Sequence, residues 1–575
     1  EFVKKLKKEK IIFIGPNPKA IKKMGDKIES KNLAIKLKLN VIPGHTAPVK
    51  NPKEALSISK KIGFPVLLKA SAGGGGKGMR IVRADKELEE NFNAARSESK
   101  NSFGDDRVFI EKYIEQPRHI EIQILCDKHG NQLHLGEREC SIQRRYQKVI
   151  EECPSPLVDK KMRESMASQA LKLAREVNYD SAGTVEFVVD SNKNFYFLEM
   201  NTRLQVEHPV TELVTGIDLV EQMIYCADNK KLKLKQSDIK LDGWSIESRI
   251  YAEDPSKDFL PSIGRISQYL EPNSAHFEGG KVRNDTGISP GSEISIYYDP
   301  MISKLAVHHK DRSSAIELMI NSLQCYYLSG VENNIGFLIS ILNDKKFKNG
   351  LLTTNFIKDK FKNGYQSEIG VTEEIVRKIS IASVLVLIKQ LMNIDLSKNS
   401  ELTVKILDQY VPIKIKKISF SNELYVVLIK INNSNYTLCS DWKLNQKLLV
   451  AEINDKKEYF KVVKIQNLHK INIEHLGVKL DVSIFPSSQK TYYDFMPKQS
   501  NEDLSRKLIS PMPGLVKSVS VTDNQKIKSG EQLIIIEAMK MENILRSEKD
   551  CIVDKVLIKE GDSVSTDEEL ILFKK

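Results

Sequence analysis

The sequence predicts a multidomain protein in which mixed α/β domains come first and two β domains follow. Two observations indicate several domains with a β domain at the end: a length of 575 residues and an internal repeat near the C-terminus. The α/β character of the first half is what a family resemblance, given below with its motifs, implies. At about 150 residues per domain, the length favours roughly four domains. The hydrophobic content of 41% and the charged content of 29% are typical of globular chains, so we expect several packed cores.

The composition excludes several classes of partner. The net charge of +12 comes from dispersed lysines, and the densest cluster, Lys4–Lys8, has no interleaved aromatic residues, so we expect no nucleic-acid groove. The longest apolar stretch, Ile381–Ile388, is too short to span a bilayer, so we expect no membrane partner. Seven scattered cysteines without a CxxC pair argue for a reducing compartment and against structural zinc. We expect a cytoplasmic protein, or one of the mitochondrial matrix if the organism is a eukaryote.

A glycine-rich loop lies between two expected strands early in the chain. The strand-like runs Phe64–Ala70 and Met79–Arg83 flank a loop that contains Gly73–Gly76. Glycines allow backbone N–H groups to close over a phosphate chain, and the nearby Lys69 could add charge. A plain flexible hairpin loop explains the pattern as well, because a strand rather than a helix follows the glycines.

A β-hairpin is expected at residues 184–201, because a polar tetrad separates two β-rich runs. A register centred on that tetrad places Glu186 opposite Glu199 and Thr184 opposite Asn201. The same register gathers an apolar face of Val185, Phe187, Val189, Tyr196, Leu198 and Met200. Two opposed glutamates about 5 Å apart repel each other, and Mg²⁺ (or Mn²⁺) bound by their oxygens would remove the conflict. A solvated glutamate pair on an exposed face is the alternative.

The chain that follows this hairpin alternates polar and apolar residues. In an extended segment, a period of two puts Asn201, Arg203, Gln205 and Glu207 on one side. A guanidinium, an amide and a carboxylate beside the metal pair suit a small planar oxyanion with a removable proton. Arginine provides forked donors, and the carboxylate can act as the base. An edge strand with a polar outer face would show the same alternation.

The middle of the chain predicts a helix followed by an antiparallel barrel. Thr372–Met392 has the apolar spacing of a helix, and strand-like runs follow it. These runs are Val411–Phe420, Leu424–Ile431, Tyr459–Ile465, Ile471–Ile473 and Lys479–Phe485. No catalytic constellation is apparent in this part, so we interpret it as a docking module. A stretch rich in Ser, Gln, Lys and Asp then reads as a linker.

Near the C-terminus, Lys540 lies between two apolar runs in Glu537–Glu542 (EAMKME). An internal repeat surrounds it, since Gly514–Ile536 aligns without gaps on Cys551–Phe573, 37 residues further on. Two equivalent half-sheets joined by a hairpin that presents one lysine describe a small flattened β-barrel. With Pro511–Gly514 (PMPG) at its start, this region resembles the biotinyl carrier domain of biotin-dependent carboxylases. The resemblance implies biotin covalently attached to Lys540.

The first half is similar to the ATP-grasp biotin carboxylase component of the same enzymes. The similarity runs from about Ile11 to Phe361, and its motifs are long and in order. They are Met24–Lys27, Lys69–Arg80, Glu111–Tyr113, Pro117–Glu121, Glu137–Arg145, Glu199–Pro209 and Tyr298–Met301. The resemblance implies that ATP activates bicarbonate and that the resulting CO₂ is transferred to biotin.

Residue roles follow from this resemblance, position by position. For ATP, it implies contacts from Lys27, Lys69, Gly74, Gly75, Gly76, Glu111, Lys112, His119 and Gln143. For the metal ion, Mg²⁺ or Mn²⁺, it implies Glu186, Glu199 and Asn201. For bicarbonate, it implies Lys148, Arg203 and Gln205, with Glu207 as the base that removes its proton. Arg249 would stabilise the biotin enolate.

The resemblance divides the chain into a remnant of an N-terminal α/β subdomain (1–25), an ATP-grasp domain (26–240), a biotin carboxylase C-terminal domain (241–364), the middle domain (365–485), the linker (486–507) and the carrier domain (508–575). Two departures stand out. Tyr146 occupies a position where many biotin carboxylases have histidine, and a tyrosine cannot supply an imidazolium near pH 7. The family also has a complete α/β subdomain before Ile14–Pro16, so we expect that this chain is a fragment.

The order of carboxylase, middle domain and carrier resembles the alpha subunits of propionyl-CoA carboxylases, particularly at Phe495–Lys498, Ser505–Val516 and Asn543–Asp550. This implies a hetero-oligomer with a carboxyltransferase beta subunit, modification by biotin protein ligase, and bicarbonate and an acyl-CoA, propionyl-CoA, as substrates. Two alternatives stay open: the alpha subunit of a methylcrotonyl- or acetyl-CoA carboxylase, or a biotinylated carrier and assembly protein without activity.

Overall fold

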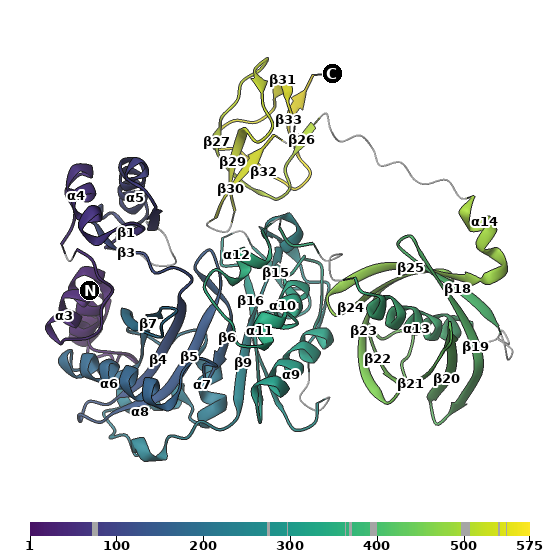
Figure 1. Cartoon of the computed structure of the whole chain (residues 1–575), viewed down its shortest axis with the longest axis horizontal. Coiled ribbons are helices and arrows are strands. Elements are labelled where there is room, and N and C mark those ends of the chain that lie inside the picture. The colour runs from purple at the N-terminus through teal and green to yellow at the C-terminus, as the bar shows by residue number, and fades with distance from the viewer. Residues whose placement is uncertain are drawn as a thin grey trace.

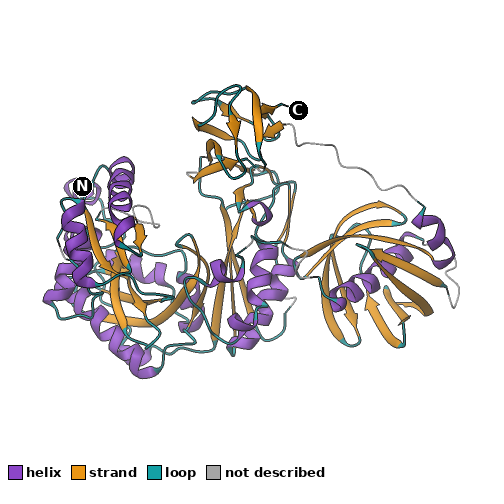
Figure 2. Cartoon of the chain, turned by 45° about the horizontal axis from the view of Figure 1, so that its top comes forward, coloured by secondary structure: helices purple, strands orange, loops and turns teal. Residues whose placement is uncertain are grey.

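The computed structural model describes residues 1–45, 47–71, 79–272, 277–295, 297–362, 364–366, 371–391, 400–495, 507–538, 541–547 and 549–574 (Figure 1). Four positions that the sequence nominated lie outside the described residues: Gly74, Gly75, Gly76 and Lys540. Helices and sheets are mixed in the N-terminal part, a barrel around a helix lies beside it, and a small β domain holds the C-terminus (Figure 2). The fold class predicted from the sequence is confirmed.

The N-terminal part contains helices and a small antiparallel sheet with the strand order β2-β1-β3. The helices are α1 (Phe2–Lys8), α2 (Pro18–Gly25), α3 (Lys27–Lys36), α4 (Pro52–Ile62) and α5 (Leu88–Phe103), and the strands are β1 (Val66–Ala70), β2 (Met79–Val82) and β3 (Val108–Lys112). Phe92 of α5 packs with Leu68 and Ile110 of the sheet in one buried core. Strands β1 and β2 pair with each other, as the two predicted strands on either side of residues 72–78, which lie outside the described residues.

A large antiparallel sheet forms the centre of the carboxylase-like part, with the order β14-β16-β9-β6-β5-β4-β7-β8. Its strands are β4 (Arg118–Cys126), β5 (Gln132–Arg144), β6 (Gln147–Cys153), β7 (Ser181–Val189), β8 (Phe195–Asn201), β9 (Trp244–Tyr251), β14 (Lys281–Thr286) and β16 (Met301–His309). Because β6 pairs with β9, one continuous sheet carries residues from both sides of the expected domain boundary at residue 240.

Helices and short strand pairs surround this sheet. The helices are α6 (Lys160–Glu176), α7 (His208–Thr215), α8 (Leu219–Ala227), α9 (Arg312–Cys325), α10 (Ile335–Leu342), α11 (Lys345–Lys348) and α12 (Phe356–Lys360). The strand pairs are β10 (Glu253–Asp254) with β11 (Leu260–Pro261), β12 (Gly264–Arg265) with β15 (Glu293–Ile294), and β13 (Gln268–Leu270) with β17 (Tyr327–Ser329). Met166 and Leu173 of α6 pack under the sheet against Ile122 of β4.

The β7–β8 hairpin confirms part of the predicted register and corrects the rest. Glu186 lies opposite Glu199, as expected, but a bulge follows, and Phe187 then pairs with Phe197. The bulge moves Phe197 into the core beside Phe187, whereas Tyr196 is only half-buried. The predicted apolar face was therefore wrong at Tyr196 and Leu198, because one extra residue in a strand reverses which side chains face the core.

The middle part is a closed antiparallel barrel built around one helix. Helix α13 (Glu373–Gln390) matches the predicted helix, and Thr372 caps it by accepting a hydrogen bond from the Ile375 N–H. The barrel strands are β18 (Glu401–Ile406), β19 (Gln409–Ser421), β20 (Leu424–Ile431), β21 (Ser434–Ser440), β22 (Leu448–Ile453), β23 (Lys456–Asn467), β24 (Lys470–His475) and β25 (Val478–Pro486). The helix shares one buried core with these strands, which explains why residues 379–388 carry no charged side chain on any face. No helix in the described ranges is long and apolar enough to cross a membrane.

The C-terminal domain follows helix α14 (Lys490–Asp494), which occupies the start of the predicted linker. It consists of two four-stranded sheets, ordered β26-β33-β31-β28 and β30-β29-β27-β32. The strands are β26 (Lys507–Ile509), β27 (Gly514–Val519), β28 (Lys526–Ile527), β29 (Gln532–Ala538), β30 (Met541–Arg546), β31 (Cys551–Val556), β32 (Ser563–Val564) and β33 (Glu569–Phe573). Strands β27, β28 and β29 begin 37 residues before β31, β32 and β33, so the internal repeat corresponds to two structurally equivalent halves.

Candidate functional site

A cavity of about 370 Å³ gathers most of the side chains that the sequence nominated. It lies where the large sheet meets α3 and the small sheet. Thirteen nominated residues line it: Lys27, Lys69, Glu111, His119, Gln143, Lys148, Glu186, Glu199, Asn201, Arg203, Gln205, Glu207 and Arg249. These residues are spread over more than 200 positions of the sequence, so their convergence is a property of the fold.

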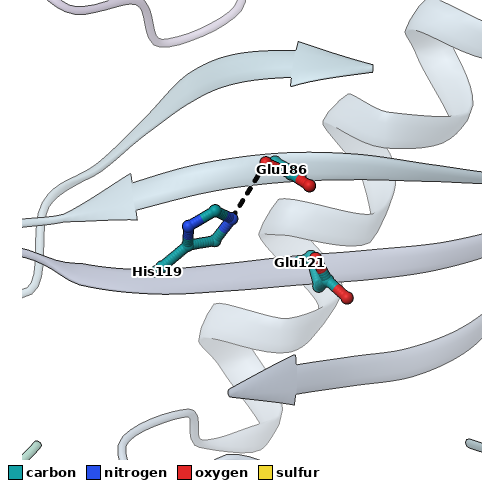
Figure 3. Close-up of side chains that lie close together, drawn as sticks. All are labelled: His119, Glu121 and Glu186. Carbon is teal, nitrogen blue, oxygen red and sulfur yellow. Dashed lines mark ion pairs between the residues drawn. The ribbon is translucent and has the colours of Figure 1, made fainter. Parts of the chain in front are cut away.

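The carboxylate of Glu186, on β7, accepts contacts from several sides, one of them drawn in Figure 3. His119 Nε2 lies 2.9 Å from Oε2, Lys148 Nζ lies 3.3 Å from Oε1, and the amide nitrogens of Asn201 and Gln205 donate to Oε1 at 2.8 and 2.9 Å. Burial acts to raise the pKa of Glu186, but the charges of Lys148 and His119 outweigh it and hold the pKa far below its usual range. The carboxylate is therefore ionised at neutral pH.

Oxygen ligands that suit Mg²⁺ lie together at this point. Glu186 and Glu199 are direct neighbours across the hairpin, and Asn201 adds an amide oxygen two residues along β8. His119, Glu121 and Glu186 also bring ligand atoms within 4.8 Å of one another (Figure 3). Burial acts to lower the pKa of His119, but Glu186 outweighs it and raises the pKa. Mg²⁺ prefers oxygen ligands to an imidazole nitrogen. Glu186, Glu199 and Asn201 are thus the better fit to Mg²⁺.

Glu207 is a buried carboxylate held between two cations at the start of α7. Lys148 Nζ contacts one of its oxygens, and Arg249 Nη2 contacts the other at 2.9 Å. Burial acts to raise the pKa of Glu207, but Lys148 and Arg249 outweigh it and hold the pKa well below its usual range. Arg249 is in turn held by Glu151, which accepts from its Nε at 2.6 Å. The arrangement presents an ionised carboxylate beside a fixed guanidinium.

The segment between β8 and α7 differs from the extended strand that the sequence predicted. Strand β8 ends at Asn201, and the chain then bends and turns before α7 begins at His208. Arg203, Gln205 and Glu207 nevertheless line the same cavity. The predicted grouping is therefore correct, although the backbone that produces it is irregular and the period-two argument does not apply to it.

Lys31 is a site residue that the sequence reasoning missed. Its Nζ lies 2.5 Å from Glu111, and Lys69 Nζ lies 2.6 Å from the other oxygen of the same carboxylate. Asp26 caps α3 by accepting from the backbone N–H groups of residues 28 and 29. Lys31 stands one helical turn after Lys27, and this i, i+4 spacing was the signal that could have found it.

A second cavity of about 520 Å³ adjoins the first and is more apolar. Lys69, His119 and Gln143 line both, whereas Lys112 lines only the second, with its Nζ donating to the carbonyls of residues 63 and 64 at 3.0 Å. Tyr146, in the turn between β5 and β6, also lines both cavities. Its φ of +65°, together with the φ of +51° at Arg145, is the geometry of the two-residue turn that joins the paired residues Arg144 and Gln147.

Comparison with protein families divides the chain into matched regions. Residues 26–235 match the carbamoyl-phosphate synthase L chain, ATP binding domain, and residues 247–359 match the biotin carboxylase C-terminal domain. Residues 387–499 match the propionyl-coenzyme A carboxylase BT domain, and residues 506–573 match the family described as biotin-requiring enzyme.

Several known proteins are similar to this chain over nearly its whole length. The chain is 45% identical to the mitochondrial propionyl-CoA carboxylase alpha chain of Homo sapiens, over 99% of this chain and 79% of the relative. It is 42% identical to the propionyl-CoA carboxylase alpha chain of Ruegeria pomeroyi, over 100% of this chain and 87% of the relative. The mitochondrial methylcrotonoyl-CoA carboxylase alpha subunit of Dictyostelium discoideum is 36% identical, over 95% of this chain and 79% of the relative.

Solved structures also resemble the carboxylase-like part, and two of them carry nucleotides. The biotin carboxylase domain of Hydrogenobacter thermophilus 2-oxoglutarate carboxylase, in complex with MgADP, ADP and bicarbonate, superposes with a TM-score of 0.61 at 47% identity, covering 62% of this chain and 78% of that one. A biotin carboxylase complex with beta-gamma-ATP from Campylobacter jejuni gives a TM-score of 0.60 at 45% identity, covering 62% and 79%.

Proposed function

Because this chain belongs to the family of propionyl-CoA carboxylase alpha chains, we propose that the cavity around Glu186, Glu207 and Arg249 is where it carboxylates biotin. The chain is an ATP-dependent carboxylase subunit that combines biotin carboxylase and biotin carrier regions, and its cofactors are biotin, ATP and Mg²⁺. Biotin, when bound, supplies the nitrogen that accepts CO₂.

Glu207 is the base that removes the proton of bicarbonate. A base must be ionised before it can accept a proton, and Lys148 and Arg249 keep this carboxylate ionised in a buried position. The same two cations would attract an anionic substrate to the base. This pairing is the observation that carries the proposal.

Arg203, Gln205 and Lys148 bind bicarbonate next to that base. Arg203 offers a planar fork of donors, the geometry that suits a planar oxyanion. Lys148 contacts both Glu186 and Glu207. It therefore lies between the proposed metal ligand and the proposed base, where its ammonium can bind a bicarbonate ion. Arg249 offers a fixed positive charge where negative charge develops during carboxylation, and a preorganised charge of this kind stabilises a transition state.

ATP binds across the two adjoining cavities. Lys27, Lys69 and His119 supply positive charge for phosphate oxygens, as the sequence predicted, and Mg²⁺ held by Glu186, Glu199 and Asn201 would offset the remaining charge. Glu111, Lys112 and Gln143 complete the predicted nucleotide contacts. The glycines at 74, 75 and 76 are assigned to the phosphates from their sequence motif alone.

The second half of the reaction takes place on another chain. Alpha chains of this family act with a carboxyltransferase beta subunit, and we propose the helix-filled barrel around α13 as the part that contacts it. Propionyl-CoA is the proposed acyl acceptor, and biotin protein ligase the enzyme that modifies Lys540. A cytoplasmic location, or the mitochondrial matrix in a eukaryote, stays a prediction; several relatives are named as mitochondrial.

The proposal is tested by two assays on the biotinylated chain: bicarbonate-dependent ATP hydrolysis with free biotin, and transfer of label from bicarbonate to Lys540. We expect Glu207→Gln to abolish both. Glu176→Gln, on the outer surface of α6, is the matched control and should change neither. Label on Lys540 of the Glu207→Gln protein would disprove the assignment of the base. If the biotinylated chain without any substitution shows no activity in either assay, the result would support the alternative of a biotinylated carrier without catalysis.

Acyl specificity needs a separate assay with the beta subunit present. The 36% identity to a methylcrotonoyl-CoA carboxylase subunit makes methylcrotonyl-CoA the competing substrate. Comparing propionyl-, methylcrotonyl- and acetyl-CoA as acceptors, we expect propionyl-CoA to give the highest kcat/KM. A higher value for methylcrotonyl-CoA would reassign the subunit.

A further inference from the structure

Arg138 is a fully buried arginine behind the wall of the cavity, on β5, and it is not among the residues that line the cavity. A guanidinium has five N–H donors and no acceptor, and each group of this one finds a partner. Nε donates to Glu121 at 2.6 Å, Nη1 to Gln123 and Thr211 at 2.6 and 3.0 Å, and Nη2 to Thr184 and Gln205 at 3.1 and 2.9 Å. Five donors thus meet five acceptors that come from β4, β7, α7 and the segment before α7.

One of these contacts fixes the direction of the Gln205 amide. An amide has an acceptor end and a donor end. The acceptor end, Oε1, faces Arg138, which can only donate, and the donor end, Nε2, faces the ionised carboxylate of Glu186 at 2.9 Å. If the amide were flipped, its NH₂ group would face the N–H donors of Arg138, and its oxygen would face the carboxylate of Glu186. Arg138 therefore decides which end of Gln205 points into the site.

A second contact leads to Lys148. Glu121 accepts from Arg138 with Oε1 and from Lys148 Nζ with Oε2, both at 2.6 Å. Lys148 Nζ continues to Glu186 and Glu207. Because Arg138 anchors one oxygen of Glu121, the other is held where it can position the ammonium of Lys148. Two of the groups assigned to bicarbonate are thus connected to the same buried guanidinium.

We propose that Arg138 is a positioning residue for bicarbonate, which fixes Gln205 directly and Lys148 through Glu121 without touching the substrate. This inference rests on the roles assigned to Gln205 and Lys148 in the proposed function. The alternative is that Arg138 only joins four elements of the fold. The two differ in one respect: a positioning role affects bicarbonate more than ATP.

The test uses Arg138→Lys in the full chain. Lysine keeps the charge but has three donors and no planar fork, so it cannot serve five acceptors. We expect kcat/KM for bicarbonate to fall about 10- to 100-fold, the range measured for residues that orient ligands from the outside, while KM for ATP stays within about twofold. Thr184→Val removes one acceptor from the Nη2 group that holds Gln205, and we expect a smaller loss in the same direction. This second variant serves if Arg138→Lys does not fold.

A double mutant separates positioning from general damage. If Arg138 acts partly through Gln205, then adding Arg138→Lys to Gln205→Met should cost less than the product of the two single losses, because interacting residues are not additive. Arg163→Lys is the matched control: Arg163 donates to buried Glu137, the residue before Arg138, at 2.5 and 2.7 Å, but neither residue lines the cavity. We expect this control to lower Tm without changing either KM.

Three results would overturn the inference: an unchanged kcat/KM for bicarbonate in Arg138→Lys despite a lower Tm, equal losses for bicarbonate and ATP, or fully multiplicative losses in the double mutant. Absence of bicarbonate-dependent ATP hydrolysis in the unmodified protein would instead overturn the proposed function on which the inference rests. The two failures are therefore distinguishable in one set of assays.

Discussion

Glu186 and Glu199 face each other directly across the β7–β8 hairpin, so two carboxylates are close neighbours on one edge of the large sheet. Lys148 and His119 offset the charge of Glu186, and Lys27 Nζ lies 3.7 Å from Glu199. Opposed like charges normally destabilise a sheet. Side-chain cations offset this repulsion, and a bound divalent ion would do so further, which links the stability of the hairpin to metal binding.

Glu199→Gln is expected to weaken metal binding while leaving the fold intact. A ligand lost from the metal itself should cost at least the roughly tenfold seen when partners of a ligand are removed. The Mg²⁺ concentration for half-maximal ATP hydrolysis, and the Mn²⁺ affinity measured by electron paramagnetic resonance, should both shift by that factor or more. Glu164→Gln, on α6, is the control. An unchanged Mn²⁺ affinity in Glu199→Gln would place the metal elsewhere.

Lys31→Met is expected to raise KM for ATP and to leave KM for bicarbonate unchanged. Lys31 and Lys69 share the carboxylate of Glu111, so Lys31 can neutralise Glu111 when Lys69 turns to a phosphate. Without Lys31, the movement of Lys69 to a phosphate would leave the buried carboxylate of Glu111 without a cation. A hydrogen bond to a charged group is worth about 1.5–3 kcal/mol, which predicts an increase of about tenfold or more. Steady-state kinetics with Lys36→Met as the control, on the outer part of α3, measure this. Equal changes in both KM values would disprove the assignment.

Glu247→Gln is expected to stabilise the protein at high pH only. Glu247 is fully buried on β9 opposite Glu151. Burial, together with Glu151 and Glu207, raises its pKa well above the usual range, although Lys304 and Arg249 act to lower it. Between the pKa of an unfolded glutamate, about 4.3, and the raised value, the folded protein binds more protons than the unfolded chain. Stability therefore falls as pH rises through this window.

A single such group contributes a slope of up to about 1.4 kcal/mol per pH unit. The neutral amide of Glu247→Gln does not titrate, so its Tm should exceed that of the unmodified protein at pH 8 and approach it near pH 4.5. Glu90→Gln, on the exposed side of α5, should give no such trend. A Tm difference that is constant across this pH range would show that Glu247 does not change its protonation on unfolding.

Sequence reasoning could find the residues of the site because they lie in local motifs, and it missed those that only the fold brings close. The spacing of Glu186 and Glu199 around a turn gave their pairing, and the repeat around residue 540 gave the two halves of the carrier domain. Lys31 and Arg138 act on partners up to 80 positions away, and apart from the i, i+4 spacing of Lys27 and Lys31 no local pattern marks such contacts. The alternation of polar and apolar residues before Glu207 predicts a strand, whereas residues 202–207 form an irregular segment that ends in a turn.

The bulge in β8 is the clearest case in which local periodicity was misleading. It predicts that two neighbouring aromatic residues contribute differently to stability. A strict period of two placed Tyr196 in the core, whereas the structure buries Phe197 beside Phe187. Phe197→Ala should therefore destabilise the protein by about 3–5 kcal/mol, the usual cost of removing a buried phenylalanine. Tyr196→Ala should cost about 1 kcal/mol, because this ring is half-buried and its hydroxyl makes only a long hydrogen bond to Asp190. Urea unfolding of both variants measures the difference, and a larger loss for Tyr196→Ala would favour the register without a bulge.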